Sequence, residues 1–428
     1  MATSTAQEVS KVRVAELIKR EEDRFRSARP RSHELWNEAR EVLPRGVPSS
    51  FQDAAPQPVF VDHGQGSRVW DADGNEYVDF HNGFGVMVVG HAHPKIVEVV
   101  SKQVARGSHF AQPVEDAVVV AKELSRRFKQ PQWRFTNSGT ESTLDAVRIA
   151  RGDQMGPADA PASIPQSEGI PAAVVELTSV IPFNDLAAAE KAFAKHPGEI
   201  AAVIVEPAMM NVGIVLPDQG YLAGLRDLAH KHGALLIFDE VKTGVTIAPG
   251  GATERFGVVP DLVALAKAIG GGLPCGAVGG RADVMAVIEQ KRVAQMGTFN
   301  GNPLTTAASR ATLLEVLTPT AYAHFDALAE TLQGGLDAVI AEHSLPFHVT
   351  TLAARGCVTY RRQRVRNYRD YLEIDKSLAY LSWLYQCNRG VLMAPGAEEN
   401  WTLSVQHSVE DVQRYVDNFA EMARDLRA

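Results

Sequence analysis

The chain has 428 residues, of which 45% are hydrophobic and 22% are charged, and its formal net charge is −8. This composition is typical of a globular protein and excludes wholesale disorder and collagen-like repeats. The length indicates two or three domains. Because proteins that bind nucleic acids or anionic membranes are usually basic, the negative charge disfavours both partners.

Cysteine content and hydropathy predict the cellular compartment. The three cysteines, Cys275, Cys357 and Cys387, are too few and too widely spaced for a disulfide framework or a zinc site. The N-terminal segment has no apolar signal core, and no stretch is apolar over the roughly 18 residues that a membrane span requires. We therefore expect a cytoplasmic protein without a membrane partner.

Residues 1–93 are expected to form an N-terminal unit. Within it, residues 8–42 carry a sparse apolar stripe on a charged background, which predicts helix. Residues 58–80 alternate apolar and polar side chains around an Asp-Ala-Asp-Gly-Asn turn. This alternation predicts an antiparallel strand–turn–strand unit.

Residues 94–310 are expected to form a large α/β domain. Helical segments alternate there with short apolar runs, and Gly and Asp lie at the junctions. This alternation predicts crossover units and a mainly parallel sheet that is covered on both faces. The expected helices are 95–107, 114–128, 185–196 and 218–232, and the expected strands are 133–138, 200–207, 234–241 and 262–267.

Residues 311–428 are expected to form a smaller α+β domain, which the N-terminal strands complete. A long helix, strands near 346–361 and a terminal helix from 408 are predicted within it. One segment fits neither domain pattern. Residues 152–171 carry four prolines and almost no apolar periodicity, which predicts a long loop, and such loops inside compact domains are often functional or mobile.

Two strand ends carry the first candidate catalytic residues. Asp239 ends the predicted strand ALLIFD and Lys267 ends LVALAK. Open α/β sheets bind ligands beyond the carboxyl ends of their strands, so both side chains can enter one crevice. A desolvated lysine is a nucleophilic amine, and a carboxylate stabilises a protonated pyridine nitrogen. This pair suits pyridoxal phosphate; taken singly, each residue is more often an ordinary strand-end charge.

Residues 135–143 (FTNSGTEST) contain a candidate phosphate site. A predicted strand leads through Ser138, Gly139 and Thr140 directly into a helix. Free backbone N–H groups, two hydroxyls and the positive end of a helix dipole would bind a phosphate there. A plain helix cap is an equally good explanation of the isolated motif. A turn-rich segment, GTFNGNP (297–303), carries Thr298.

Five motifs occur together in the order, and close to the spacing, of a known family. They are SGTE, IVEP, FDEV, LAKAIGGGLPCGAVGG and GTFNGNP. From about residue 40 to the end, the chain resembles the class III aminotransferases, which are fold type I pyridoxal-phosphate enzymes, and most closely their glutamate-1-semialdehyde aminomutase branch. The resemblance implies a homodimer with shared active sites and small-molecule amine and carbonyl substrates. It implies ping-pong transfer, with Lys267 as the residue that moves the substrate proton.

The resemblance also implies site roles residue by residue. Lys267 would be the Schiff-base lysine and Asp239 the partner of the pyridine nitrogen. Val241 would pack on one ring face, and Glu206 would lie near the O3′ side. Ser138, Gly139 and Thr140 would hold the phosphate, and Thr298 would reach the phosphate of the neighbouring subunit. Glu399 resembles a stretch on the substrate side, although an exposed loop carboxylate is the simpler interpretation.

Two departures from the family pattern bear on function. Gln52 stands where the aminomutase branch has an arginine that binds the substrate carboxylate, and an amide cannot make that charged bidentate pair. This favours an aminotransferase over an aminomutase, although Arg45 lies nearby and could compensate. The family's aromatic-His-Gly turn is also missing between Arg151 and Phe183. We therefore keep a degenerate dimeric scaffold with impaired cofactor binding as an alternative.

Overall fold

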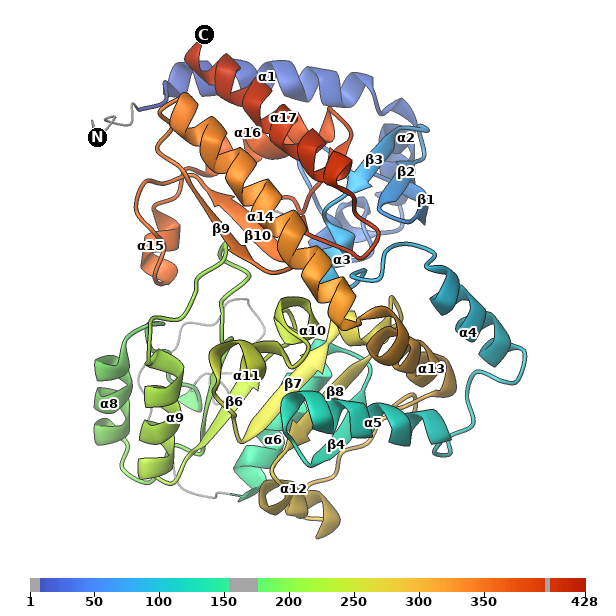
Figure 1. Ribbon diagram of the computed structural model, residues 1–428, viewed down its shortest axis with the longest axis vertical. Coiled ribbons are helices and arrows are strands. Elements are labelled where there is room, and N and C mark those ends of the chain that lie inside the picture. Colours follow the sequence, from blue (N-terminus) through green and yellow to red (C-terminus); the bar gives the residue numbers. More distant parts are fainter. Residues whose placement is uncertain (1–7, 154–175, 397–400) are drawn as a thin grey trace.

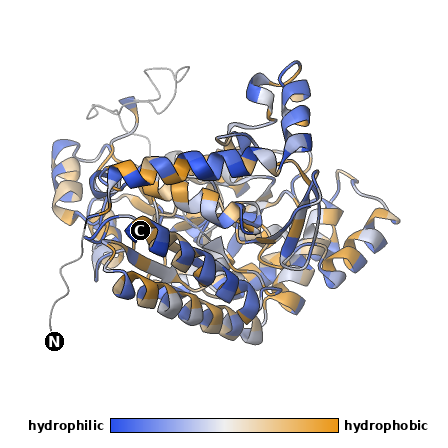
Figure 2. Cartoon of the chain, turned by 90° about the horizontal axis from the view of Figure 1, so that it is seen from above, coloured by the Kyte–Doolittle hydropathy of each residue, from blue (hydrophilic) through white to orange (hydrophobic). Residues whose placement is uncertain are grey.

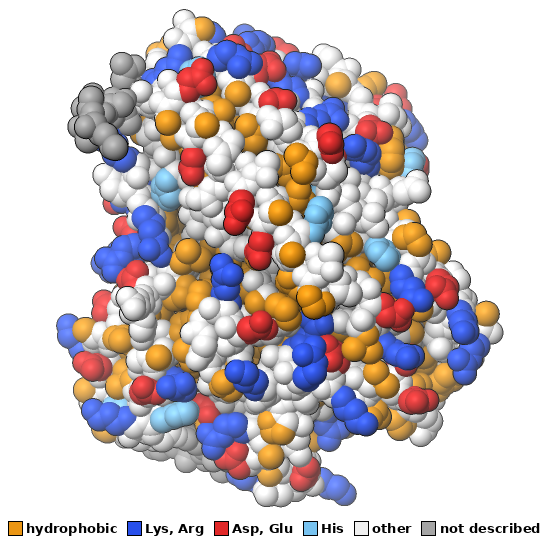
Figure 3. All heavy atoms as spheres, viewed as in Figure 1, with side chains coloured by type: hydrophobic (Ala, Val, Ile, Leu, Met, Phe, Trp, Pro, Cys, Tyr) orange, Lys and Arg blue, Asp and Glu red, His pale blue; other side chains and the backbone are white. Residues whose placement is uncertain are grey.

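The computed structural model describes residues 8–153, 176–396 and 401–428. Figure 1 shows two parts, with the long helix α14 (Pro319–Glu342) running from the upper part to the lower one. Figure 3 shows that this face is indented between the two parts and that hydrophobic side chains gather there. No helix in the described ranges is long and apolar enough to cross a membrane.

The lower part is built on a five-stranded sheet of order β4-β8-β7-β6-β5. Strands β5, β6 and β7 pair in parallel, whereas β8 runs antiparallel to both β7 and β4. Four of these five strands therefore point the same way, and the predicted mainly parallel sheet is confirmed. The strands are β4 (Gln132–Thr136), β5 (Ala202–Val205), β6 (Leu235–Asp239), β7 (Leu262–Ala266) and β8 (Gly276–Gly280).

Strand β8 is the one strand of this sheet that the sequence did not predict. Its sequence is Gly-Ala-Val-Gly-Gly, and glycine is depleted in strands. The glycines make room for side chains of the neighbouring strands. A Cβ on Gly279 would lie 2.6 Å from the ring of Trp133, and one on Gly280 would lie 2.4 Å from Leu262 Cδ2. The local sequence disfavours a strand, but packing requires these residues.

Helices cover both faces of the sheet, because successive residues of β6 point to opposite sides. Leu235 and Ile237 pack with residues of α6 and α12 in one apolar cluster. Leu236 and Phe238 belong to the larger cluster on the other face, together with residues of α5 and α9. These helices and their neighbours are α4 (Pro94–Val104), α5 (Glu115–Phe128), α6 (Gly139–Asp153), α8 (Leu186–Lys195), α9 (Tyr221–Lys231), α10 (Gly244–Ile247), α11 (Gly251–Phe256), α12 (Ala282–Glu289) and α13 (Pro303–Ala311).

The upper part contains two smaller sheets, of orders β1-β2-β3-β11 and β12-β10-β9. Strand β3 pairs in parallel with β11, so the N-terminal and C-terminal segments share one sheet. The predicted boundaries at 93/94 and 310/311 stay proposals. The strands are β1 (Val61–Gln65), β2 (Arg68–Asp71), β3 (Glu76–Asp79), β9 (His348–Leu352), β10 (Arg355–Thr359), β11 (Val391–Leu392) and β12 (Trp401–Thr402).

Helices α1, α14, α16 and α17 cover these sheets, and in Figure 2 several helices are hydrophobic along one side and hydrophilic along the other. The predicted helical region 8–42 is divided in two, because Pro30 lacks the N–H that would continue the first helix. The remaining helices of this part are α1 (Lys11–Ser27), α2 (Pro30–Ala39), α3 (Asn82–Gly85), α15 (Tyr368–Leu372), α16 (Lys376–Cys387) and α17 (Val409–Arg427).

Candidate active site

Lys267 and Asp239 leave the sheet at the same edge. Asp239 is the last residue of β6, Lys267 directly follows β7, and these strands are parallel neighbours in which Asp239 lies opposite Ala264. Burial raises the pKa of Asp239, while the N–H of Val241 (3.1 Å) and the positive charge of Lys267 lower it. The two side chains thus interact electrostatically at one edge, as the sequence predicted.

Glu206 joins them from the next strand. It follows β5 and accepts hydrogen bonds from the N–H of Met210 (3.1 Å) and the side-chain amide of Asn211 (3.4 Å). Burial raises the pKa of Glu206, the negative charge of Asp239 raises it further, and Lys242 lowers it. Three neighbouring strand ends therefore supply three ionisable groups. Sequence reasoning missed Asn211, whose one signal was its place in the loop after β5.

The start of α6 lies against the same edge. Ser138 Oγ accepts the N–H of Glu141 (3.2 Å), and the first backbone bond of the helix runs from Ser142 to Ser138 (3.1 Å). The N–H groups of Gly139 and Thr140 therefore have no acceptor inside the helix. The hydroxyl of Ser142 donates to the carbonyl of Leu265 (2.9 Å) and holds α6 to β7.

Gly139 also touches the end of β6. A Cβ at this position would lie 2.7 Å from Cγ1 of Val241, two residues after Asp239. One edge of the five-stranded sheet thus brings together the predicted phosphate loop (residues 138–140), Val241 and the pair Asp239 and Lys267. The start of α6 therefore lies beside the segment that follows Asp239, and a phosphate site at this helix N-terminus stays a prediction.

Thr298 is exposed in the described chain. Its neighbours Met296 and Phe299 are 86% and 58% exposed. Asn300, in the same segment, accepts a hydrogen bond from the side chain of Asn137 (2.8 Å), which places the segment beside the start of α6. A contact of Thr298 with a second subunit stays a prediction.

The candidate substrate residues are placed only in part. Gln52 is exposed, and its amide oxygen accepts the N–H of Ser49 (3.2 Å). The side chain of Arg45 is 75% exposed and is paired with Asp53. Glu399 lies outside the described residues, as does most of the proline-rich segment 152–171.

The described sheet ends at β5, on which Ile204 is 44% exposed. Within the described residues, no strand pairs with the outer side of β5. The predicted consequence of the missing aromatic-His-Gly turn, a weakened cofactor site, stays a prediction.

Two further charged residues next to Asp239 were missed by sequence reasoning. Glu240 is completely buried, and its carboxylate accepts the N–H of Ala252 (2.6 Å) and the hydroxyl of Thr243 (3.2 Å). Burial raises the pKa of Glu240 to about 8. Lys242 is also buried, and its ammonium donates to the carbonyl of Met210 (3.3 Å). Their only sequence signal was that they follow Asp239 within three residues.

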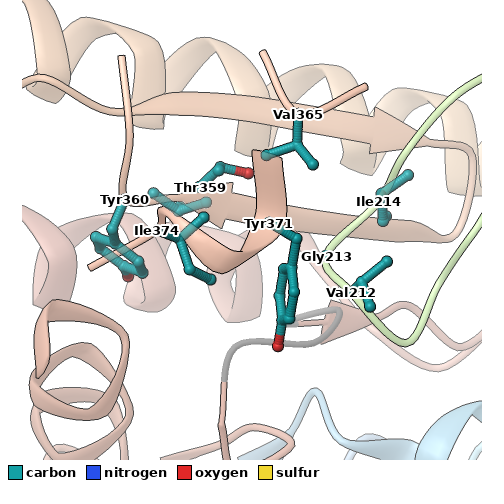
Figure 4. Close-up of a pocket in the computed structure, with 9 residues that line it drawn as sticks. Val212, Gly213, Ile214, Thr359, Tyr360, Val365, Tyr371 and Ile374 are labelled. Carbon is teal, nitrogen blue, oxygen red and sulfur yellow. The ribbon is translucent and has the colours of Figure 1, made fainter. Parts of the chain in front are cut away.

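A small cavity opens beside the loop that follows Asn211. Figure 4 shows side chains from the loop and from the segment after β10 pointing toward one another across it. Its lining contains no charged residue. It therefore lacks the ionisable groups of the strand-end site, which we define as Glu206, Asp239 and Lys267. The lining residues are Val212, Gly213, Ile214, Val358, Thr359, Tyr360, Val365, Tyr371 and Ile374. Within the described ranges, no group of His, Cys, Asp or Glu could hold a metal ion.

Comparison with known proteins identifies the family. Residues 50–164 and 157–359 match the family model described as aminotransferase class-III. The chain belongs to the class III aminotransferases. The two matched ranges meet inside the proline-rich segment, where the sequence lacks the aromatic-His-Gly turn. The cofactor of this family is pyridoxal 5′-phosphate.

Similar proteins include aminomutases and transaminases. Glutamate-1-semialdehyde 2,1-aminomutase 2 of Brevibacillus brevis is 35% identical over 91% of this chain and 97% of its own length. A glutamate-1-semialdehyde aminomutase structure from Pseudomonas aeruginosa has a TM-score of 0.89 and 33% identity, covering 98% of this chain and 99% of that one. An omega-transaminase structure from Sphaerobacter thermophilus has a TM-score of 0.88 and 32% identity, covering 93% and 98%. The predicted fold type I architecture is confirmed.

The strand-end site fits this cofactor chemically. Asp239 is a largely buried carboxylate that suits a cationic ring nitrogen, and Lys267 supplies an amine at the same edge. The N–H groups of Gly139 and Thr140 suit a phosphate. They lie at the N-terminus of the 15-residue helix α6, where the helix dipole favours negative charge.

Proposed function

We propose that the protein is an aminotransferase that moves an amino group from an amine or amino acid donor to a carbonyl acceptor in two half-reactions. The observation that carries the proposal is the meeting of Lys267 and Asp239 at one sheet edge, beside the open start of α6. The family membership supports it.

The proposal assigns the cofactor contacts to residues of this edge. Ser138, Gly139 and Thr140 would hold the phosphate, Val241 would pack on the ring, and Asp239 would hold the ring nitrogen. When bound, pyridoxal phosphate supplies a carbonyl that accepts an amino group and a ring that stabilises negative charge on the reacting carbon. Glu206 is proposed to lie near the O3′ side. Because its pKa is raised, it retains a proton over a wider pH range than an exposed glutamate.

Lys267 is proposed to move the substrate proton. Its amine lies directly after β7, where the following residues form a glycine-rich turn with little side-chain bulk. A positioned amine that takes a proton from one carbon and returns it to another is a general acid–base catalyst, which typically contributes a factor of about 10² to 10⁴. Burial raises the pKa of Asp239, and the positive charge of Lys267 offsets part of that rise.

Gln52 favours aminotransferase over aminomutase activity. A neutral amide offers a substrate carboxylate no charged bidentate partner, and the nearby Arg45 is already paired with Asp53. The second candidate function is an aminomutase, and the names of the curated relatives favour it. A degenerate scaffold is the third candidate, favoured by the missing aromatic-His-Gly turn.

We also propose a homodimer in which Thr298 reaches the phosphate of the other subunit. The exposure of Met296 and Phe299 around Thr298 supports an interface, because large apolar side chains gain free energy when a partner covers them. Sedimentation should show a dimer at micromolar concentrations. A stable and active monomer would exclude the shared site. Location in the cytoplasm stays a prediction.

The decisive experiment separates the two half-reactions. Protein loaded with pyridoxal phosphate is mixed with an amine donor and no acceptor, and the released carbonyl product is measured. An aminotransferase should release about one carbonyl per active site and continue only after a carbonyl acceptor is added.

The controls distinguish the three candidates. Lys267→Ala should abolish release, whereas Lys231→Ala, on the exposed side of α9, should leave it unchanged. Conversion of glutamate 1-semialdehyde without a free carbonyl product would establish the aminomutase instead. Loss of the cofactor on gel filtration, with no turnover of any substrate, would support the degenerate scaffold.

A further inference from the structure

The short helix α10 follows the end of β6 closely. It begins three residues after Val241, and all four of its residues are buried. A helix of four residues is not stable on its own, because forming the first turn costs more free energy than its hydrogen bonds return. The shape of α10, and with it the path of the backbone that leaves Asp239, therefore depends on contacts from other segments.

Arg355 makes two of these contacts from strand β10, which lies above α10 in Figure 1. It is completely buried, and its guanidinium donates to the carbonyl of Lys242 (2.9 Å) and to the hydroxyl of Thr246 (3.2 Å). That hydroxyl donates in turn to the carbonyl of Lys242 (2.9 Å). The guanidinium and Thr246 therefore hold the backbone directly after Val241.

The same guanidinium is anchored on its other side in the upper part of the molecule. It donates to the hydroxyl of Thr402 on β12 (2.8 Å) and to the carbonyl of Gly85 (3.5 Å). A Cβ on Gly85 would lie 2.0 Å from the guanidinium nitrogens, so glycine is required there. The N–H of Ala354 also donates to the carbonyl of Thr246 (3.3 Å). Strand β10 thus joins the upper part to α10 at one place.

An arginine suits this position because of the shape of its side chain. A guanidinium is planar and carries five N–H donors in fixed directions, so one residue reaches oxygen atoms of several segments at once. A lysine ammonium is a single nitrogen and does not span the same separation. Because a buried charged donor is costly without an acceptor, any shift of α10 away from Arg355 is opposed.

The same loop is held to the lower part by its own side chains. The carboxylate of Glu240 accepts the N–H of Ala252 (2.6 Å), and the ammonium of Lys242 donates to the carbonyl of Met210 (3.3 Å). Arg355 adds a hold from the upper part. The backbone that follows Asp239 is therefore fixed from two sides.

We propose that Arg355 is a positioning residue of the cofactor site, whose guanidinium holds Lys242 and α10 so that Val241 and Asp239 meet the ring of pyridoxal phosphate in the correct geometry. The inference rests on the cofactor site of the proposed function. It applies to an aminotransferase and to an aminomutase alike, because it concerns the binding of the cofactor.

The test measures cofactor binding without turnover. Cofactor-free protein, shown to be folded by circular dichroism, is titrated with pyridoxal phosphate, and the absorbance gives the Kd. Arg355→Lys keeps the charge but not the planar donors and should raise the Kd by about 10-fold or more. Arg355→Met should raise it further, so lysine should rescue part of the affinity.

The visible absorbance band of the bound cofactor is the second readout. It should shift in Arg355→Lys, because Asp239 and Val241 no longer hold the ring in the same place, whereas a loss of stability alone does not move it. Thr246→Val removes only one acceptor of the guanidinium and keeps the size of the side chain. It should raise the Kd by about 3-fold or more, and it carries the test if the Arg355 variants do not fold.

Arg29 offers a matched control, because it is a second buried arginine in the described chain. It is 2% exposed, and its guanidinium donates to the carbonyls of Phe25 (3.0 Å) and Cys387 (3.1 Å), which both lie in the upper part. Arg29→Lys should lower the midpoint of chemical unfolding. It should change the Kd for pyridoxal phosphate by no more than about 2-fold and leave the absorbance band in place.

The outcomes separate this inference from the proposed function. If Arg355→Lys and Thr246→Val bind the cofactor like the wild type, or if Arg29→Lys weakens binding as much as Arg355→Lys, the positioning role is wrong. If the wild type does not bind pyridoxal phosphate, the inference and the proposed cofactor site are both overturned. If the expected differences in Kd are found but no amino group is transferred from donor to acceptor, the inference stands and the aminotransferase proposal fails.

Discussion

The contact between Gly139 and Val241 predicts the effect of a single methyl group. In Gly139→Ala the new Cβ would lie 2.7 Å from Cγ1 and 2.9 Å from Cγ2 of Val241. Carbon atoms pack best at about 3.5–4.0 Å, so both contacts are about 1 Å too short. Gly139 does not have a left-handed backbone, so the cost comes from this overlap alone. Overpacking of this kind costs about 1–3 kcal/mol.

The same change should weaken the cofactor site. The methyl group pushes the N-terminus of α6 away from the end of β6, and the two elements are proposed to bind the phosphate and the ring. We expect Gly139→Ala to lower the midpoint of chemical unfolding and to release pyridoxal phosphate faster during dialysis. Tryptophan fluorescence measures the unfolding, and cofactor absorbance measures the retention.

A double-mutant cycle tests the cause. Val241→Ala removes both clashing carbons, so Gly139→Ala should cost at least about 1 kcal/mol less in that background. The matched control is Gly334→Ala in the middle of α14, where no atom lies within 4 Å of the new Cβ. It should stabilise the protein by about 0.5–1 kcal/mol. Wild-type stability and cofactor retention in Gly139→Ala would show that α6 and β6 are not held at this distance.

Three further predictions concern charged residues. Borohydride reduction followed by peptide mapping should find the pyridoxyl group on Lys267, and a label on the buried Lys242 would overturn the assignment. Asp239→Asn should fold with near wild-type circular dichroism and lose most activity, at least about 100-fold in kcat; near-normal turnover would mean that another group pairs with the ring nitrogen. The hydrogen bond from Arg126 lowers the pKa of Glu123, so its stabilisation is present above pH 4.5 and is lost as the pH falls through the lowered value. Glu123→Gln should therefore be less stable than the wild type at pH 7, and the difference should shrink in acid titration; a constant difference would contradict the linkage.

The central strands were predictable because each is a run of consecutive apolar residues, which is typical of a strand that is buried on both faces. Strands β6 and β7 are continuous apolar runs; β6 ends at Asp239, and Lys267 directly follows β7. Because the carboxyl ends of parallel strands meet at one edge of the sheet, the sequence alone predicts that Asp239 and Lys267 lie at the same edge. The start of α6 was predictable for a similar reason, because Ser138 and Gly139 interrupt the pattern between strand and helix.

Some buried charged residues were not predictable, since their contacts depend on distant segments of the chain. Arg355 lies 270 residues from its hydrogen-bond partner Gly85. Nothing in its local sequence distinguishes it from an exposed arginine, and only the packing of three segments buries it. From the sequence, Glu240 looks like a second charged residue at the end of a strand. In the structure it is completely buried.

The sequence by itself determined the α/β class, the order of the main helices and strands, and the two strand-end residues on which the chemistry is proposed to depend. These follow from local hydrophobic periodicity and from where it stops. The tertiary structure decided that a glycine-rich segment becomes strand β8, that the start of α6 touches Val241, and that Arg355 is completely buried. Each of these features depends on which side chains from distant parts of the sequence pack into the adjacent space. The conformational preferences of the local residues do not predict that packing.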